Sequence, residues 1–205
     1  MQDPSAAREL LALVRGHRLS GIVMTAARLG IADAIAAGST TVDALARATD
    51  THAPTLLRLL RALAAAGVLH EGADGSFGLT PAGELMRTDV PGSLAPAIAM
   101  MDRDEVHEVW RHLDHSIRTG ENAFTALHGE DLWSWRAARP DEAAIFDRSM
   151  TAQSAGIGRA VADSYDFGSA SVVADIAGGA GSLLAGVLRA NSHLRGILFD
   201  QPSVV

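Results

Sequence analysis

Apolar residues recur at close to the helical repeat through most of the first 165 residues. In residues 5–37, positions such as Leu10, Val14 and Ile22 fall on one side of a helix, which predicts a helical segment. Glycine is the weakest helix former after proline. Three glycines are therefore expected to divide this stretch into shorter helices: Gly16, Gly21 and Gly30.

Residues 39–90 carry the start and stop signals of short elements. Thr41 is a predicted N-cap, and Pro54 suits the first turn of the next helix, which is expected to end at Gly67. Two short strands then flank Ala73-Asp74-Gly75, a hairpin turn signal. Another helix opens at Thr80-Pro81. This order of helix, turn, helix and hairpin indicates a winged-helix arrangement.

The pattern of apolar residues changes from helical to strand-like near residue 171. Residues 94–162 read as helices, in pieces of roughly 94–119, 123–128, 130–138 and 141–162. After them come a Val- and Ile-rich run, a glycine turn, an amphipathic segment and a second apolar run, which together predict one βαβ unit. We expect three regions: 1–95, a helical segment 96–164, and 165–205.

Composition excludes several classes of function. The net charge is −7, every basic residue is arginine, and there is no cysteine. Disulfides, thiolate catalysis and Cys-ligated zinc are therefore excluded. A DNA-binding regulator is disfavoured, because the second helix of the winged portion offers Arg58 and Arg61 among many Leu and Ala residues. No run approaches the ~20 apolar residues of a membrane span, and no signal peptide is visible. We expect a cytoplasmic protein with no nucleic-acid or membrane partner.

The glycine turn is the strongest candidate for chemistry. The segment from Ala177 to Gly181 lies between a predicted strand and a predicted helix, so a ligand can approach the backbone closely. Asp175 ends the first strand, and Asp200 ends the second, about twenty residues beyond the loop, where a carboxylate can accept ribose hydroxyls. A dinucleotide site would need a third glycine that the loop lacks. The alternatives are a nucleoside site of another kind and an ordinary turn.

The stretch from Phe146 to the end resembles the family of S-adenosylmethionine-dependent small-molecule O-methyltransferases, which includes plant phenolic and bacterial polyketide enzymes. Phe146 to Met150 resembles a Phe-Asn-x-Ala-Met motif, with Asp147 at the Asn place. Further matches are Tyr165-Asp166-Phe167, the glycine loop, Leu194-Arg195-Gly196, Asp200, Pro202 and Val204. Earlier matches at that family's spacing are Trp110, Leu113, Ser116, Thr119-Gly120, Phe124, Gly129, Trp133 and Pro140.

The resemblance implies a fold class and a set of site residues. The fold would be a mainly α winged-helix dimerisation domain, followed by the first βαβ of a Rossmann-like α/β methyltransferase core. The cofactor would be S-adenosyl-L-methionine, held by Asp175, Ala177, Gly178, Gly179, Gly181, Asp200 and Ser154. The acceptor would contact Phe146, Met150 and Trp110. Ala177 stands where the family usually has glycine.

The resemblance also implies an activity and a partner. The activity would be methyl transfer to a hydroxyl of an aromatic or polyketide-like small molecule, and the protein would form a homodimer. The family places its catalytic histidine beyond the last residue of this sequence, so no catalytic residue is assigned here. The 205-residue chain alone is expected to be inactive. The alternative function is a non-catalytic dimerisation remnant of such an enzyme.

Two other groups of residues have less specific patterns. His107, His112 and His115 lie near Asp102, Glu105 and Asp114, but their spacing matches no strong metal-binding pattern, and we assign no metal site. Trp133 and Trp135 are expected to be packing residues.

Overall fold

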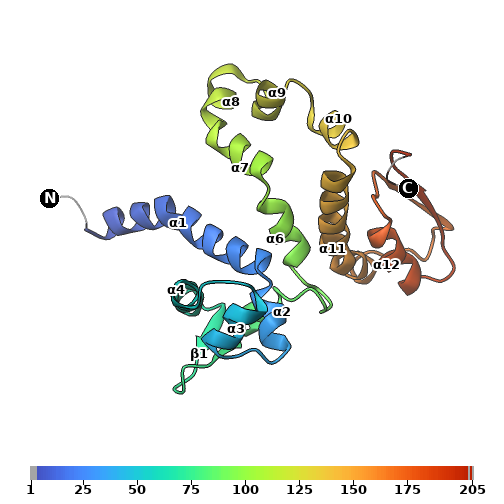
Figure 1. The fold of residues 1–205 in the computed structure, drawn as a ribbon. Helices are drawn as coiled ribbons and strands as arrows, with labels where there is room; N and C mark the ends of the chain where they lie inside the picture. Colours follow the sequence, from blue (N-terminus) through green and yellow to red (C-terminus); the bar gives the residue numbers. More distant parts are fainter. Residues whose placement is uncertain (1–3, 203, 205) are drawn as a thin grey trace. The chain divides into compact units, whose positions relative to one another are not determined.

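The computed structural model describes residues 4–202 and Val204. The chain divides into two compact units, Met1–Ala95 (unit 1) and Pro96–Val205 (unit 2). Figure 1 shows the order of the helices and strands along the chain. The predicted segments 96–164 and 165–205 lie together in unit 2.

Unit 1 opens with a long helix, α1 (Pro4–Arg28), and a short one, α2 (Ile31–Ala36). The prediction that Gly16 and Gly21 divide this stretch is wrong, because both keep helical backbone within α1. A glycine inside a helix costs only about 1 kcal/mol relative to alanine. Gly30 does end α1, since its φ of 67° turns the chain into α2.

The two following helices have the ends that the sequence predicts. In α3 (Val42–Ala48), the Thr41 hydroxyl accepts the Ala44 N–H at 3.3 Å. The helix α4 (Ala53–Ala65) carries proline in its first turn, and Gly67, with φ 76°, follows its C-terminus. Between them they bury a continuous apolar face. The large, fully buried side chains of unit 1 are Ile31, Leu45, Leu60, Leu63 and Phe77.

A small hairpin completes this core. The strands β1 (Leu69–Glu71) and β2 (Phe77–Leu79) pair antiparallel, with Leu69 opposite Leu79. The predicted turn at residues 73–75 joins them, and Gly75 takes positive φ. The helix α5 (Pro81–Glu84) then begins with the Thr80 hydroxyl accepting the Gly83 N–H.

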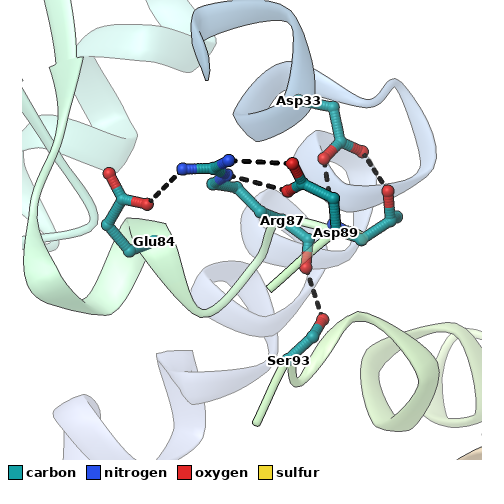
Figure 2. Close-up of polar contacts among 6 residues, drawn as sticks. Asp33, Glu84, Arg87, Asp89 and Ser93 are labelled. Atoms are coloured by element: carbon teal, nitrogen blue, oxygen red, sulfur yellow. Dashed lines mark hydrogen bonds and ion pairs between the residues drawn. The ribbon is translucent and has the colours of Figure 1, made fainter. Parts of the chain in front are cut away.

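A polar network fixes the segment after α5 to α2 (Figure 2). Arg87 donates to both carboxylate oxygens of Asp89, at 3.0 and 2.9 Å, and to Glu84 at 2.9 Å. These bonds lower the pKa of Asp89. The backbone N–H and hydroxyl of Thr88 donate to the Asp33 carboxylate of α2, at 2.9 and 3.1 Å. The connection is therefore held by ion pairs and hydrogen bonds as well as by packing.

Unit 2 begins with short helices. Their bounds are α6 (Ala95–Met101), α7 (Asp104–Arg111), α8 (Leu113–Thr119), α9 (Ala123–His128) and α10 (Leu132–Ala137). Phe124 is buried between α9 and α10, with its ring centroid 4.3 Å from that of His128 and 5.7 Å from that of Trp135. Asp131 caps α10 by accepting the backbone N–H groups of Trp133 and Ser134, at 2.9 and 3.1 Å.

The long helix α11 (Pro140–Ser164) packs along α12 (Ser182–Ala190). Their contact depends on two glycines. A Cβ on Gly158 would lie 2.5 Å from the Leu183 carbonyl oxygen, and one on Gly186 would lie 2.8 Å from the Cα of Gly158. Side chains at these two positions would push the helices apart.

The strands β3 (Val172–Ile176) and β4 (Arg195–Phe199) are parallel and joined through α12, as the sequence predicts. Val172 pairs with Arg195 and Ile176 with Phe199. On one face, Leu184 and Leu188 of α12 lie over Gly196. The large apolar residues exposed on the other face are Val172, Ile176, Ile197 and Phe199. None of the helices in the described part of the chain is long and apolar enough to cross a membrane.

Candidate functional site

The loop between β3 and α12 is fixed to the end of β4 and to Asp200 by three hydrogen bonds that its backbone N–H groups donate. The N–H groups of Ala177 and Gly178 donate to the Phe199 carbonyl, at 2.8 and 3.4 Å. The Gly179 N–H donates to Oδ2 of Asp200 at 2.7 Å. Two residues that are far apart in sequence, Asp200 and the loop glycine, therefore meet at the carboxyl ends of the two parallel strands.

Position 178 requires a glycine, because neighbouring side chains lie too close for a Cβ there. A Cβ there would lie 2.5 Å from a Leu198 methyl carbon and 2.7 Å from Oδ2 of Asp175. That carboxylate oxygen is buried and has no hydrogen-bond partner among the described residues. A buried acceptor without a partner is unusual in a folded protein.

A cavity of about 1040 Å³ opens beside this loop. Its walls come from α10, from α11, from the loop and from the residues that follow β4. The volume is at the upper end of the range for small-molecule sites, about 300–1,000 Å³. Apolar side chains line most of it, and a few polar groups are set among them, as expected for a site that orients a small organic molecule.

The structure brings most of the predicted site residues to this cavity. The cavity lining contains Asp175, Ala177, Gly178, Gly179, Asp200, Ser154, Phe146 and Met150. Gly181 is not in the lining and is the N-cap of α12, with φ 78°. Trp110 is not in the lining. It lies on α7 and is 69% exposed.

Among the lining residues that sequence reasoning missed are Trp133 and Arg136 of α10. Both tryptophans of this helix were expected to pack. Trp135 does so against Phe124, whereas Trp133 is 56% exposed and its ring meets that of Phe146 edge-on at 5.7 Å. Their spacing could have indicated a shared surface, because Trp133 and Arg136 are three residues apart and such residues lie on the same helix face.

Arg136 has an unusual environment. Its guanidinium carbon lies 3.8 Å from the centroid of the Phe146 ring. Burial lowers the pKa of Arg136, and the carboxylates of Glu105, Asp147 and Glu142 oppose that shift. The guanidinium remains charged, because an arginine side chain is not deprotonated in proteins.

The histidines of α7 and α8 do not form a metal centre with their acidic neighbours. His107 lies 4.0 Å from Asp102, and His115 lies 3.5 Å from Glu121. The His112 ring is hydrogen-bonded to the Glu108 carbonyl. Residues 4–202 and Val204 contain no group of three or more potential ligands placed to hold a metal ion.

Comparison with known proteins matches each unit to one domain. Residues 11–89, within unit 1, match the O-methyltransferase dimerisation domain. Residues 110–205, within unit 2, match the O-methyltransferase domain. The chain is thus a helical dimerisation domain followed by a methyltransferase domain.

Individual relatives agree with this assignment. The O-demethylpuromycin-O-methyltransferase of Streptomyces alboniger is 41% identical over 199 residues, which are 96% of this chain and 53% of that protein. The crystal structure of LaPhzM superposes with a TM-score of 0.90 at 36% identity, covering 97% of this chain and 60% of that one.

A third relative was solved with a ligand. CalO1, a methyltransferase in calicheamicin biosynthesis in its S-adenosylhomocysteine-bound form, superposes with a TM-score of 0.85 at 31% identity, covering 100% of this chain and 61% of that one. The chain spans little more than half the length of the curated relatives it matches. On these matches, together with the glycine loop and its acidic partner, the chain belongs to the family of S-adenosylmethionine-dependent O-methyltransferases.

Proposed function

We propose that the protein transfers the methyl group of S-adenosylmethionine to a hydroxyl of an aromatic or polyketide-like small molecule. One observation carries this proposal. A backbone loop tied to Asp200 faces, across one cavity, the aromatic side chains of α10 and α11. The relative from Streptomyces alboniger is by name an O-methyltransferase of O-demethylpuromycin, which supports the class of reaction.

The residues of the loop fit the cofactor. Each carboxylate oxygen of Asp200 accepts one backbone N–H, from Gly179 and from Gln201, both at 2.7 Å. Each oxygen keeps a lone pair, so the pair of oxygens can accept two ribose hydroxyls. Gly179 lines the cavity, and no atom lies within 4 Å of the place where its Cβ would be, so a ligand can approach the backbone there. Asp175 and Gly178 also line the cavity. Ser154 adds a hydroxyl from the opposite wall.

When bound, the cofactor supplies a methyl group on a positively charged sulfur. The acceptor side of the cavity would be formed by Phe146 and Met150, with Trp133 beside them. These side chains offer flat, polarisable surface that suits an aromatic ring. Trp110 stays a prediction as an acceptor contact, because it lies outside the cavity lining.

The acceptor hydroxyl must lose its proton as its oxygen attacks the methyl carbon. The described residues that line the cavity include carboxylates but no histidine. We therefore keep the expectation that the 205-residue chain by itself is inactive. A radiolabelled methyl-transfer assay on this chain tests it, and multiple turnovers would contradict both this expectation and the alternative of a non-catalytic remnant.

Cofactor binding is tested by titrating S-adenosylhomocysteine into the chain in a calorimeter. We expect a single site in the wild type and a loss of at least about tenfold in affinity for Asp200→Ala, which removes charged acceptors. Asp163→Ala is the matched control, since Asp163 pairs with Arg159 on the surface of α11 and does not line the cavity. Binding that survives Asp200→Ala undiminished would refute the assignment.

We also propose that the protein is a homodimer formed through α1. This helix exposes Leu10, Leu13 and Val14, at 63%, 79% and 62%, and an apolar stripe of this size is typical of an interaction surface. Sedimentation at micromolar concentration should give twice the chain mass. Leu13→Arg should shift the mass to that of a monomer, and a monomeric wild type would contradict the proposal.

We also propose that unit 1 is a winged-helix domain, that the core of unit 2 is Rossmann-like and that the protein is cytoplasmic. A DNA-reading role for unit 1 is disfavoured by α4, where Leu56, Leu60 and Leu63 are buried. Its Arg61 forms an ion pair with Glu71 at 2.9 Å, which offsets the positive charge of this helix.

A further inference from the structure

Asp147 is a carboxylate of the cavity that the cofactor-binding proposal leaves without a role. It belongs to α11 and lines the cavity. Neither of its carboxylate oxygens has a hydrogen-bond or ion-pair partner among the described residues, and neither is buried. The other lining carboxylates differ from it, because Asp200 accepts a hydrogen bond at each oxygen and one oxygen of Asp175 is buried. The Asp147 carboxylate is therefore open to a molecule in the cavity.

Asp147 lies between the two ends of the cavity. Its neighbour in the sequence, Phe146, meets the ring of Trp133 at 5.7 Å and forms the aromatic end. In the other direction Ser154 follows seven residues later on the same face of the helix, which is about 10 Å further along the axis. Ser154 is thus closer to Gly158, where α11 packs against α12. The Asp147 carboxylate therefore lies where the cofactor side of the cavity meets the acceptor side.

The cavity carries more negative than positive charge. Its described lining contains one guanidinium, that of Arg136, and the carboxylates of Asp147, Asp175 and Asp200. Arg136 stacks on the Phe146 ring at 3.8 Å and forms no ion pair with Asp147, although that carboxylate favours its charged form. The lining thus has an excess of carboxylates, which favours a cation in the cavity over a neutral molecule of the same shape.

We propose that Asp147 recognises the positively charged sulfur of the methyl donor. The inference rests on the proposed function, in which the methyl group passes from the cofactor to an acceptor on the aromatic side, so that the sulfur must lie where the two sides meet. Asp147 then attracts the donor and not S-adenosylhomocysteine, because transfer leaves the bonding electron pair on a sulfur that has become neutral. Asp147 is thus a specificity residue that favours binding of the donor and release of the product.

The cofactor carries a second cation, the ammonium of its amino-acid end. S-adenosylmethionine and S-adenosylhomocysteine share this ammonium and differ in the charge of the sulfur. If Asp147 binds the ammonium, removal of its charge weakens the binding of both ligands equally. If Asp147 recognises the sulfur, removal of its charge weakens the binding of the donor alone. Comparison of the two ligands therefore separates these two sources of positive charge.

The test measures the dissociation constants of three ligands by calorimetry. They are S-adenosylmethionine, S-adenosylhomocysteine and sinefungin, in which a carbon that bears an ammonium replaces the charged sulfur. The ratio of the S-adenosylhomocysteine Kd to the Kd of each cationic ligand reports the recognition of charge. Asp147→Asn keeps the shape of the side chain and removes its charge. We expect it to lower both ratios about fivefold, which is the effect of one partly exposed charge pair, and to change the Kd of S-adenosylhomocysteine by less than about twofold.

Asp163→Asn is the matched control. Asp163 lies on the same helix, pairs with Arg159 at 2.9 Å and does not line the cavity. Its ratios should equal those of the wild type. Asp147→Glu should keep most of the preference for the cationic ligands, because it retains the charge. This variant separates the loss of charge from a change in packing around the side chain.

Three results would overturn the inference. The first is an unchanged ratio in Asp147→Asn. The second is an equal loss of affinity for S-adenosylmethionine and S-adenosylhomocysteine, which would assign Asp147 to the ammonium. The third is a fall of the ratio in Asp147→Glu as large as that in Asp147→Asn, which would make shape and not charge the cause.

Binding of S-adenosylhomocysteine by the wild type tests the proposed function separately. If the wild type binds neither this ligand nor S-adenosylmethionine, the proposed function is refuted and the inference falls with it. If the wild type binds both ligands and the ratio does not depend on the charge of Asp147, only the inference about Asp147 fails.

Discussion

Replacing Ala177 by glycine should stabilise unit 2. Ala177 has a φ of 61°, in the left-handed region, at the first turn of the loop. That conformation costs a residue with a Cβ about 1–2 kcal/mol. Glycine avoids this cost but loses about 0.4–1 kcal/mol more in conformational entropy on folding. The difference predicts a net gain of about 0.5–1 kcal/mol in the free energy of unfolding for Ala177→Gly.

Urea unfolding followed by tryptophan fluorescence measures this change. All three tryptophans lie in unit 2, so the signal reports the unit that contains the loop. With a slope of about 2 kcal/mol per molar urea, the midpoint should rise by about 0.3–0.5 M. Calorimetry with S-adenosylhomocysteine shows separately whether the Ala177 methyl group also hinders the cofactor.

Ala180→Gly is the internal control. Ala180 lies in the same loop without positive φ, so glycine there only adds entropy to the unfolded chain, and the midpoint should fall. If Ala177→Gly lowers the midpoint as much as Ala180→Gly does, the Ala177 backbone is not strained and the reasoning is refuted.

Three further predictions concern packing, capping and exchange. Gly158→Ala should lower the free energy of unfolding by about 1–3 kcal/mol, because its methyl group would strike the backbone of α12. The control is Gly156→Ala, which lies in open space on the same helix and should be neutral or stabilising. Equal effects of the two substitutions would exclude this contact. Hydrogen bonds from Ser134 and the α10 backbone lower the pKa of Asp131 below its ordinary value. The stabilisation of α10 by Asp131 is therefore present near neutral pH and is lost as the pH falls through the lowered pKa. Asp131→Asn should lose this acid dependence in circular dichroism, and an unchanged profile would count against the cap. The backbone amide hydrogens of β3 and β4 should exchange with solvent much faster than those of α4, because a two-stranded sheet with one exposed face is only marginally stable. Slow exchange throughout 171–200, measured by mass spectrometry, would disprove this.

Local signals in the sequence predicted the elements well. Thr41 and Thr80 cap the helices that they were expected to cap. Gly67 and Gly75 take the positive φ that their places require. These signals work because a cap or turn depends on residues within three or four positions. Gly16 and Gly21 misled the prediction, since a glycine permits a break in a helix without requiring one.

The sequence by itself also determined the order of the two domains and the pairing of the glycine loop with Asp200, because strand ends and loop spacing are properties of the chain. Only the tertiary structure decided which side chains share the cavity. It placed Trp133 and Arg136 at the cavity and left Trp110 outside, and it brought Gly158 against Gly186. The physical reason is that such neighbours come from elements far apart in the sequence. Whether a donor such as Nη1 of Arg136 finds a partner depends on all of those elements together.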